Sequence, residues 1–341
     1  MKAVGYYQPH PITHAESLLD LDLPAPTPGP RDLLVRVHAV SVNPVDAKMR
    51  MRSQPETGKA AVLGWDAVGV VEATGPEVRH YRAGDRVFYA GSIARPGTNA
   101  ELHVVDERIV GLAPRSLDDA QAAALPLTSI TAWELLFDRL QVPRSPVASG
   151  AAAQSLLVIG GAGGVGSMLI QLARQLTGLK VIATASRPET RQWCLDLGAH
   201  AVIDHSQPFD PQLEAAGQPQ VDMVASLTQT DQHLAQIVEA LRPQGKFALI
   251  DDPKSLDATL LKRKSISLHW ELMFTRSLFN TPDIEAQREL LNEVAKLVDA
   301  GRIRTTLNAS LGTINAANLR QAHALLESGR AQGKVVLQGW G

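Results

Sequence analysis

Apolar and polar residues alternate along several short stretches in the N-terminal part of the chain. The alternation is clearest from Leu33 to Val42 (LLVRVHAVSV) and from Asp66 to Gly75 (DAVGVVEATG), and a turn precedes a further short strand within Tyr81 to Gly91. Such a two-residue period is typical of strands with one buried face. Because the links are rich in proline and glycine, as from Leu23 to Asp32, we expect a compact, barrel-like β domain over roughly the first 125 residues.

The pattern changes near Gln121, where helical and strand-like segments begin to alternate. A helix broken near Pro126 is predicted first, over residues 122–137. The predicted strands that follow are 155–160, 180–186, 201–204, 221–227, 246–251 and 265–272, and the predicted helices between them are 167–178, 188–198, 230–245 and 255–265. Near-continuous apolar strands joined by helices indicate an α/β fold with a parallel sheet covered on both faces. The tail returns to mixed elements, with helices over 283–301 and 315–329 and strands over 307–312 and 333–340.

Length and composition are those of a folded protein with two domains. The chain has 341 residues, 45% of them hydrophobic and 20% charged. Its 33 basic and 35 acidic residues give a net charge of −2, so there is no electrostatic reason to expect nucleic acid or an anionic membrane as a partner. No stretch has the pattern of a signal peptide or a membrane span. The single cysteine, Cys194, rules out an intramolecular disulfide. We expect a soluble cytosolic protein.

A glycine-rich turn lies between the first predicted strand of the sheet and its helix. It comprises Gly161, Ala162, Gly163, Gly164, Val165 and Gly166, which match G-x-G-x-x-G in the required strand-turn-helix setting. The first glycine permits a tight turn, the second lets the backbone approach a pyrophosphate, and the third lets the helix pack close to the sheet. The helix N-terminus would then hold the phosphate charge. A glycine-rich turn without a ligand is the alternative.

The end of the second strand indicates which dinucleotide is bound. Sites for NAD place an acidic residue here to accept hydrogen bonds from the ribose 2′-hydroxyl. This chain has Ser186 and Arg187 instead, with no carboxylate before Glu189. A hydroxyl followed by a guanidinium suits a 2′-phosphate, so NADP(H) is the predicted cofactor. The alternative is that Arg187 is a solvated loop residue.

Several motifs together resemble one family, the medium-chain dehydrogenase/reductase superfamily, and within it the zinc-free quinone oxidoreductase branch. The most similar subgroup is that of the proteins labelled zinc-type alcohol dehydrogenase-like. The motifs are SVNPVDAKMR (41–50), LGWDAVGVVEATGPEV (63–78), GDRVFYAG (84–91), LPLTSITAWELLF (125–137), GGAGGVGS (160–167), HWELMFTRSLF (269–279) and GKVVL (333–337). The resemblance implies a GroES-like β-barrel catalytic domain over 1–127 and 271–341, with a doubly wound Rossmann domain inserted over 128–270.

The positions of the family's catalytic zinc ligands carry other residues here. By resemblance, Asn43 stands at the first cysteine, Trp65 at the histidine of G-H-E, and Leu127 or its neighbour Thr128 at the second cysteine. An indole and a leucine side chain do not ligate zinc, and an amide is a poor substitute for a thiolate. We therefore expect no bound metal.

Without a Lewis acid, the chemistry expected is hydride transfer from NADPH to an already electrophilic quinone or enone. Asn43, Lys48 and Thr128 are the predicted hydrogen-bond donors to the acceptor, and Trp65 is a predicted apolar wall. Each has a structural alternative: Asn43 as a turn cap, Lys48 as a surface lysine, Trp65 as core and Thr128 as a helix cap. Asp46 is expected to orient Lys48 or a residue of the tail.

The resemblance also suggests further cofactor contacts and a partner. His205 matches a position beside the adenosine 2′-phosphate, although a surface loop histidine is the alternative. Leu227, Ile250 and Asp251 follow strand ends, where parallel sheets bind ligands, and Phe274 and Lys334 match positions lining the cofactor cleft. Rival functions are an alkenal or acrylate reductase and a catalytically silent NADPH sensor. The expected partners are a small-molecule substrate and a second copy of the chain, paired through the apolar edge strand at 265–272.

Overall fold

The computed structural model describes residues 1–144 and 154–341 and divides them into two compact units. Unit 1 comprises Met1–Ile130 and Phe274–Gly341, and unit 2 comprises Thr131–Met273. Both divisions fall three residues after those expected from the sequence, at 127/128 and 270/271. The first lies inside a continuous helix, α3 (Pro126–Trp133), where no change of composition marks it.

Unit 2 is built on a parallel sheet. Its strands are β9 (Ser155–Ile159), β10 (Lys180–Thr184), β11 (Ala201–Ile203), β12 (Val221–Ser226), β13 (Leu241–Leu249) and β14 (Ser267–Trp270), in the order β11-β10-β9-β12-β13-β14. Every neighbouring pair is parallel. The strand order reverses between β9 and β12, so loops diverge at the carboxyl ends of these two strands and leave room for a ligand. This confirms the predicted doubly wound sheet.

Helices connect these strands, although not all were expected. They are α4 (Gly164–Leu176), α5 (Pro188–Asp196), α6 (Phe209–Ala215), α7 (Thr230–Ala240) and the 3₁₀ helix η4 (Ala258–Lys264). The helix predicted over 230–245 stops at Ala240, because Leu241 already begins β13. The α-helix predicted over 255–265 is a 3₁₀ helix. The short helix α6 was not predicted, since prolines precede it and lie in its first turn.

The segment before unit 2 confirms the predicted break at Pro126. Helix α2 (Asp119–Ala123) ends before the proline, and α3 starts at it. The six residues of η3 (Glu134–Arg139) continue α3 as a π-helix, in which each backbone hydrogen bond joins residues five apart. The sequence did not predict this segment.

Unit 1 is the expected β domain. Its main sheet contains β3 (Asp32–Val42), β5 (Ala67–Thr74), β6 (Arg86–Tyr89), β7 (Leu102–Asp106), β8 (Val110–Leu112), β15 (Leu307–Ser310) and β16 (Lys334–Gln338). They run in the order β15-β16-β3-β5-β6-β8, and β7 also pairs with β3. The smaller sheet has the order β2-β1-β4, from β1 (Lys2–Tyr6), β2 (Leu19–Asp22) and β4 (Ala61–Val62).

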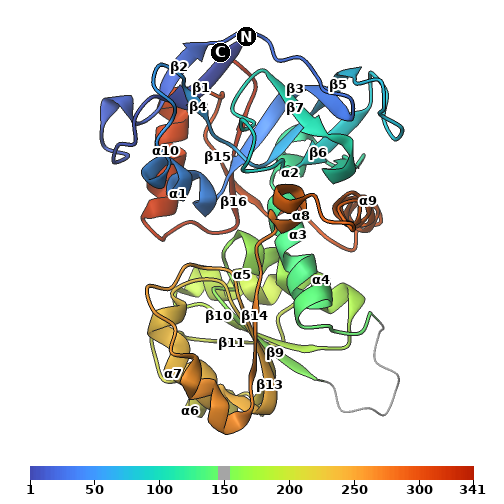
Figure 1. Cartoon of the computed structure of the whole chain (residues 1–341). Coiled ribbons are helices and arrows are strands. Elements are labelled where there is room, and N and C mark those ends of the chain that lie inside the picture. Colours follow the sequence, from blue (N-terminus) through green and yellow to red (C-terminus); the bar gives the residue numbers. More distant parts are fainter. Residues whose placement is uncertain (145–153) are drawn as a thin grey trace. The chain divides into compact units, whose positions relative to one another are not determined.

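The C-terminal tail completes unit 1. It adds α8 (Thr275–Phe279), α9 (Ala286–Asp299) and α10 (Ala316–Glu327) to α1 (Pro44–Arg52) and to the 3₁₀ helices η1 (Ala15–Ser17) and η2 (Glu107–Ile109). Strand β16 then pairs antiparallel with β3, with Val335 opposite Val42. The two termini lie together (Figure 1), where the Lys2 ammonium donates to the Gly341 carbonyl. The pairing of β16 with β3 places Lys334 beside Asn43, although the two residues are far apart in the sequence.

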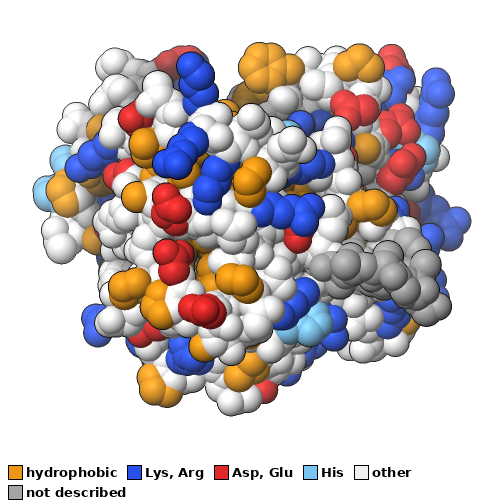
Figure 2. Space-filling model, turned by 90° about the horizontal axis from the view of Figure 1, so that it is seen from below, with side chains coloured by type: hydrophobic (Ala, Val, Ile, Leu, Met, Phe, Trp, Pro, Cys, Tyr) orange, Lys and Arg blue, Asp and Glu red, His pale blue; other side chains and the backbone are white. Residues whose placement is uncertain are grey.

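Two surface features bear on the predicted partners. On the face shown in Figure 2, basic and acidic side chains are intermingled and do not form a large area of one sign. Strand β14 is an edge strand, as expected, and Trp270 on it is 54% exposed. Dimerisation through this strand stays a prediction. Among the described residues, no helix is both long and apolar enough to cross a membrane.

Candidate functional site

The glycine turn joins β9 to α4, and two of its glycines are required by packing. A Cβ on Gly161 would lie 2.7 Å from the Ala183 Cβ and 3.2 Å from the Cys194 Sγ. A Cβ on Gly166 would lie 2.5 Å from the Gly160 carbonyl oxygen. These contacts are too short for any side chain, so both positions hold the helix close to the sheet, as the motif predicts for its third glycine.

Gly163 differs, because the fold itself does not need a glycine there. Its φ is −72°, and an added Cβ would touch only the Gly160 oxygen at an ordinary 3.5 Å. Gly163 precedes the first residue of α4, whose first-turn N–H groups lack intrahelical acceptors. Packing within the protein therefore does not require a glycine at this position. The missing side chain instead leaves space for an anionic group to approach the helix N-terminus.

Ser186 and Arg187 follow β10, as expected. Ser186 is exposed, and Arg187 precedes α5 with its side chain 37% exposed. The Arg187 Nε lies 3.1 Å from Glu189 Oε1. A carboxylate two residues away thus shares the guanidinium that would pair with a 2′-phosphate, and it would also repel that phosphate.

The other predicted cofactor residues of unit 2 also stand at the carboxyl edge of the sheet. His205 follows β11, Leu227 follows β12, and Ile250 and Asp251 follow β13. The Asp251 carboxylate accepts hydrogen bonds from the Thr230 N–H, at 2.9 Å, and from the Thr230 hydroxyl. The carboxylate therefore fixes the start of α7, and its contact with the cofactor stays a prediction.

His205 has an unexpected neighbour on α7. Its ring centroid lies 6.0 Å from that of His233, in an edge-to-face arrangement. Within the described part of the chain, the buried Nδ1 atoms of both rings have no hydrogen-bond partner. Burial lowers the pKa of His233, and any positive charge on His205 lowers it further. Contact of His205 with a 2′-phosphate stays a prediction.

In unit 1, Asp66 is the centre of a buried polar cluster. Its Oδ2 accepts from the Asn43 side-chain amide at 2.8 Å and lies 3.1 Å from the Lys334 ammonium. Its Oδ1 accepts from the Leu127 N–H at 2.7 Å. The Lys334 ammonium also donates to the Val42 carbonyl, at 3.0 Å, and to Asn43 Oδ1. Asp66 was not among the predicted site residues, although it occupies the last position of the G-W-D triplet.

This cluster corrects the prediction for Asn43. The amide nitrogen also lies 3.4 Å from the Ser41 and Trp65 carbonyl oxygens, and the side chain is 1% exposed. Since its hydrogens are directed at protein acceptors, Asn43 is not the predicted donor to an acceptor oxygen. Asn43 immediately precedes α1, so the structure places it at the start of a helix, a structural position like the turn cap given as the alternative. The Lys334 ammonium likewise donates to residues of unit 1, and its contact with the cofactor stays a prediction.

Asp46 also belongs to this environment. Its carboxylate accepts from the Asn43 backbone N–H at 2.7 Å. Burial raises its pKa to about 7 against the opposing effects of that hydrogen bond and of the Lys334 charge. Burial also raises the pKa of Asp66, while the Lys334 ammonium opposes the rise. One buried ammonium thus faces two carboxyl groups, which favours a proton on one of them.

The remaining predicted residues of unit 1 are only partly brought together. Trp65 is 2% exposed and meets Phe274 edge to face, with ring centroids 6.2 Å apart. Its indole Nε1 is buried with no hydrogen-bond partner among the described residues. The Thr128 hydroxyl, in the first turn of α3, donates to the carbonyl of Leu125, the residue before that helix, at 3.1 Å. Lys48 is half-buried on α1, and its contact with an acceptor stays a prediction.

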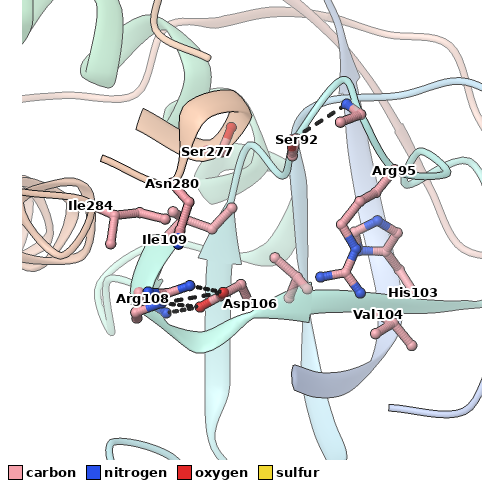
Figure 3. Close-up of a pocket in the computed structure, with 12 residues that line it drawn as sticks. Ser92, Arg95, His103, Val104, Asp106, Arg108, Ile109, Ser277, Asn280 and Ile284 are labelled. Atoms are coloured by element: carbon pink, nitrogen blue, oxygen red, sulfur yellow. Dashed lines mark hydrogen bonds and ion pairs between the residues drawn. The ribbon is translucent and has the colours of Figure 1, made fainter. Parts of the chain in front are cut away.

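A small cavity of about 110 Å³ in unit 1 contains none of these residues. It is lined from β7 and from the α8 and α9 region (Figure 3). Its two arginines are already paired: Arg95 with Asp32 at 2.8 Å, and Arg108 with Asp106 at 2.7 Å. His103 on its wall is buried, which lowers its pKa to about 4. With both cations neutralised, the cavity does not attract an anion.

The raised pKa of Asp46 predicts how stability depends on pH. A carboxyl whose pKa is about 7 when folded and 3.8 otherwise binds more protons in the folded state between these values, so stability falls as pH rises through that window. Asp46→Asn keeps an acceptor for the Asn43 N–H and removes the titration. We expect the variant to exceed wild type in free energy of unfolding at pH 8 by up to about 4 kcal/mol, and to match it below about pH 4.

Urea unfolding of both proteins from pH 4 to pH 8 measures this difference. A difference that stays constant with pH, or that grows as pH falls, would contradict the raised pKa.

Two family models match the chain. The one described as "Alcohol dehydrogenase GroES-like domain" matches residues 29–115, and the one described as "Zinc-binding dehydrogenase" matches residues 197–337. Units 1 and 2 are accordingly a GroES-like domain and a Rossmann-like parallel sheet, as predicted from the motifs.

The chain is also similar to individual proteins over nearly its whole length. It is 38% identical over 338 residues to a zinc-type alcohol dehydrogenase-like protein of Staphylococcus aureus (strain MSSA476), covering 99% of both chains. It is 29% identical over 329 residues to the quinone oxidoreductase of Rattus norvegicus, covering 94% of this chain and 92% of the relative. A crystal structure of a candidate zinc-dependent alcohol dehydrogenase protein from Rhizobium etli CFN 42 has 59% identity and a TM-score of 0.96, covering 100% of this chain and 98% of that one.

Proposed function

The chain belongs to the medium-chain dehydrogenase/reductase superfamily, and on that premise we propose that it is an NADPH-dependent oxidoreductase that reduces a quinone or an enone without catalytic zinc. The similarity to a quinone oxidoreductase supports an oxidoreductase of this kind. The donor set around Asp66 supports the absence of zinc from the reaction.

The residues at the zinc positions do not fit the metal that the family description implies. Asn43 is bound to Asp66 and Lys334, and Trp65 and Leu127 offer no ligand atom. The alternative to Leu127, Thr128, offers only a hydroxyl that already donates to the Leu125 carbonyl. The Lys334 ammonium already lies 3.1 Å from Asp66, and a divalent cation brought near it would be repelled. This buried lysine is the observation that carries the proposal, since the charge of a metal centre is supplied here by a side chain.

The residues of unit 2 do fit a dinucleotide. The Gly163 backbone and the α4 N-terminus would hold its pyrophosphate, and Ser186 and Arg187 would hold a 2′-phosphate. When bound, the nicotinamide supplies the hydride. Ser167 lies one turn into α4, where its hydroxyl donates to the Gly163 carbonyl at 2.7 Å and accepts from the Trp193 indole at 2.8 Å. These two hydrogen bonds hold the backbone of Gly163 in place relative to α4 and α5.

The absence of a Lewis acid limits the substrates. Oxidation of a simple alcohol needs stabilisation of an alkoxide, for which a metal contributes several kcal/mol. In the reduction of a quinone or enone, the hydride carries two electrons to carbon, the charge is delocalised onto the carbonyl oxygen, and a proton from solvent completes the product. Hydrogen bonding then suffices to stabilise that charge.

NADPH oxidation across a panel of acceptors tests the proposal. The panel contains quinones, enones, alkenals and acrylates, with simple alcohols plus NADP⁺ as the reverse reaction. We expect turnover with quinones or enones and none with alcohols. Turnover confined to alkenals or acrylates would replace the proposal with the double-bond reductase alternative, and NADPH binding without turnover on any acceptor would replace it with the sensor.

A further inference from the structure

The loop between β1 and β2 carries three metal-ligating side chains. His10, His14 and Glu16 each offer one ligand atom, and these atoms all lie within 4.8 Å of one another. Among the described residues, no other three His, Cys, Asp or Glu side chains are grouped in this way. The sequence carries the group as an H-x₃-H spacing followed by a glutamate, which the expectation of no metal did not take into account.

The backbone of this loop is held at several points by the body of unit 1. Arg50, fully buried on α1, donates to the His10 carbonyl at 2.5 Å. Arg320 on α10 donates to the Ala15 carbonyl at 3.2 Å and to the Leu18 carbonyl at 2.6 Å. In Figure 1 the loop lies beside α10, in blue. The ligand-bearing backbone is therefore ordered before any ion arrives, which lowers the entropic cost of binding.

Turns within the loop direct the side chains outward. The His14 N–H donates to the Pro11 carbonyl at 2.9 Å, and the Ser17 N–H donates to the His14 carbonyl at 3.1 Å. Ser17 and Leu18 are fully buried beneath the loop, whereas His14 and Glu16 are exposed and His10 is half-buried. Solvent thus has access to all three ligands, and an ion has a path of entry.

The present ring positions need only side-chain rotation to reach coordination geometry. The two imidazoles are stacked, with centroids 4.0 Å apart and planes 16° apart, so the nitrogen lone pairs lie in two nearly parallel planes and do not yet converge on one point. A tetrahedral ion with bonds of about 2.1 Å needs ligand atoms about 3.4 Å apart, and we expect rotation of the exposed His14 ring to bring the atoms, now within 4.8 Å of one another, to that separation. The rotation costs one weak hydrogen bond, from the Glu16 N–H to His14 Nδ1 at 3.2 Å.

We propose that His10, His14 and Glu16 bind one divalent transition-metal ion of the Zn²⁺ or Cu²⁺ type. Two neutral imidazoles and one carboxylate bind Zn²⁺ or Cu²⁺ in preference to Mg²⁺ or Ca²⁺. Three protein ligands leave the fourth coordination position for water. This site is independent of the proposed hydride transfer. Its occupation ties residues 10–16 together and stabilises the folded protein by an amount that grows with the logarithm of the ion concentration above the dissociation constant.

Calorimetric titration of the full chain with Zn²⁺ tests the site. We expect one equivalent to bind to wild type, with Mg²⁺ giving no heat of binding. His14→Ala and Glu16→Gln should each weaken Zn²⁺ binding by at least about tenfold, since even indirect partners of metal ligands contribute about 10–100-fold. His80→Ala, which removes an exposed histidine elsewhere in unit 1, is the matched control and should bind Zn²⁺ as wild type does.

A second readout keeps the test independent of heat signals. Cu²⁺ bound to wild type should show nitrogen hyperfine structure from two imidazoles in its electron paramagnetic resonance spectrum, and from one imidazole in His14→Ala. Unchanged Zn²⁺ binding in both ligand variants, loss of binding in His80→Ala, or no saturable binding to wild type would each overturn the proposal. Circular dichroism of the metal-free variants checks that they fold.

Discussion

Replacing Gly163 by alanine should weaken NADPH binding by roughly 10–100-fold and leave the thermal stability of the protein unchanged. The added methyl group meets only the Gly160 carbonyl oxygen, at 3.5 Å, and φ at this position is −72°, so the fold accepts it. The same methyl group fills the space through which a pyrophosphate reaches the backbone N–H groups. Losing one or more hydrogen bonds to a charged phosphate costs about 1.5–3 kcal/mol.

The matched control for this variant is Gly166→Ala, three residues further along the same turn. There the methyl group would lie 2.5 and 2.6 Å from the Gly160 and Gly161 carbonyl oxygens, so we expect a loss of about 1–3 kcal/mol in stability. Fluorescence titration with NADPH and thermal unfolding together separate the two effects. Wild-type NADPH affinity in Gly163→Ala would contradict the assignment of this turn to the pyrophosphate.

Removing the Arg187 guanidinium should weaken NADPH binding by about 1.5–3 kcal/mol and leave NADH binding nearly unchanged. The two dinucleotides differ only in the 2′-phosphate, so a selective loss reports a contact with that group. Arg187→Asp should have a larger effect than Arg187→Ala, because it adds repulsion to the lost attraction. Dissociation constants of both cofactors, measured for wild type and both variants at one ionic strength, check this.

Glu189→Gln gives the matched control for Arg187. In the present structure the Glu189 carboxylate shares the guanidinium, with 3.1 Å between Arg187 Nε and Glu189 Oε1. Neutralising it should release Arg187 and remove a like charge from the 2′-phosphate site, so NADPH affinity should rise and NADH affinity should stay the same. Equal losses for both cofactors in Arg187→Ala would mean that the residue acts on structure and does not read the phosphate.

The cofactor half of the candidate site was predictable because its signals are local. Strand, turn and helix follow one another between Ser155 and Leu176, and G-x-G-x-x-G lies wholly within that stretch. The parallel sheet then places every strand end at the same edge, which also brought His205, Leu227 and Ile250 to the expected position. Whether these side chains touch a cofactor depends on contacts that no strand pattern encodes.

The polar cluster around Asp66 was not predictable in the same way, because it depends on long-range pairing. Lys334 reaches Asn43 only because β16 pairs with β3, and Leu127 reaches Asp66 from the start of α3. From the sequence, Asn43 was equally compatible with a donor to substrate and with a turn cap. The burial of Asp66 decides between them, since a buried carboxylate requires nearby donors and takes the Asn43 amide for that purpose.

Hydride transfer from NADPH at a site that uses no metal can be tested by one activity measurement. NADPH oxidation with a quinone or enone acceptor is followed in His14→Ala, a variant without the proposed surface metal site, after exhaustive chelation and with metal content checked by elemental analysis. We expect full activity in the metal-free protein and no increase when Zn²⁺ is added. Activity that disappears with the metal and returns in proportion to added Zn²⁺ would contradict it.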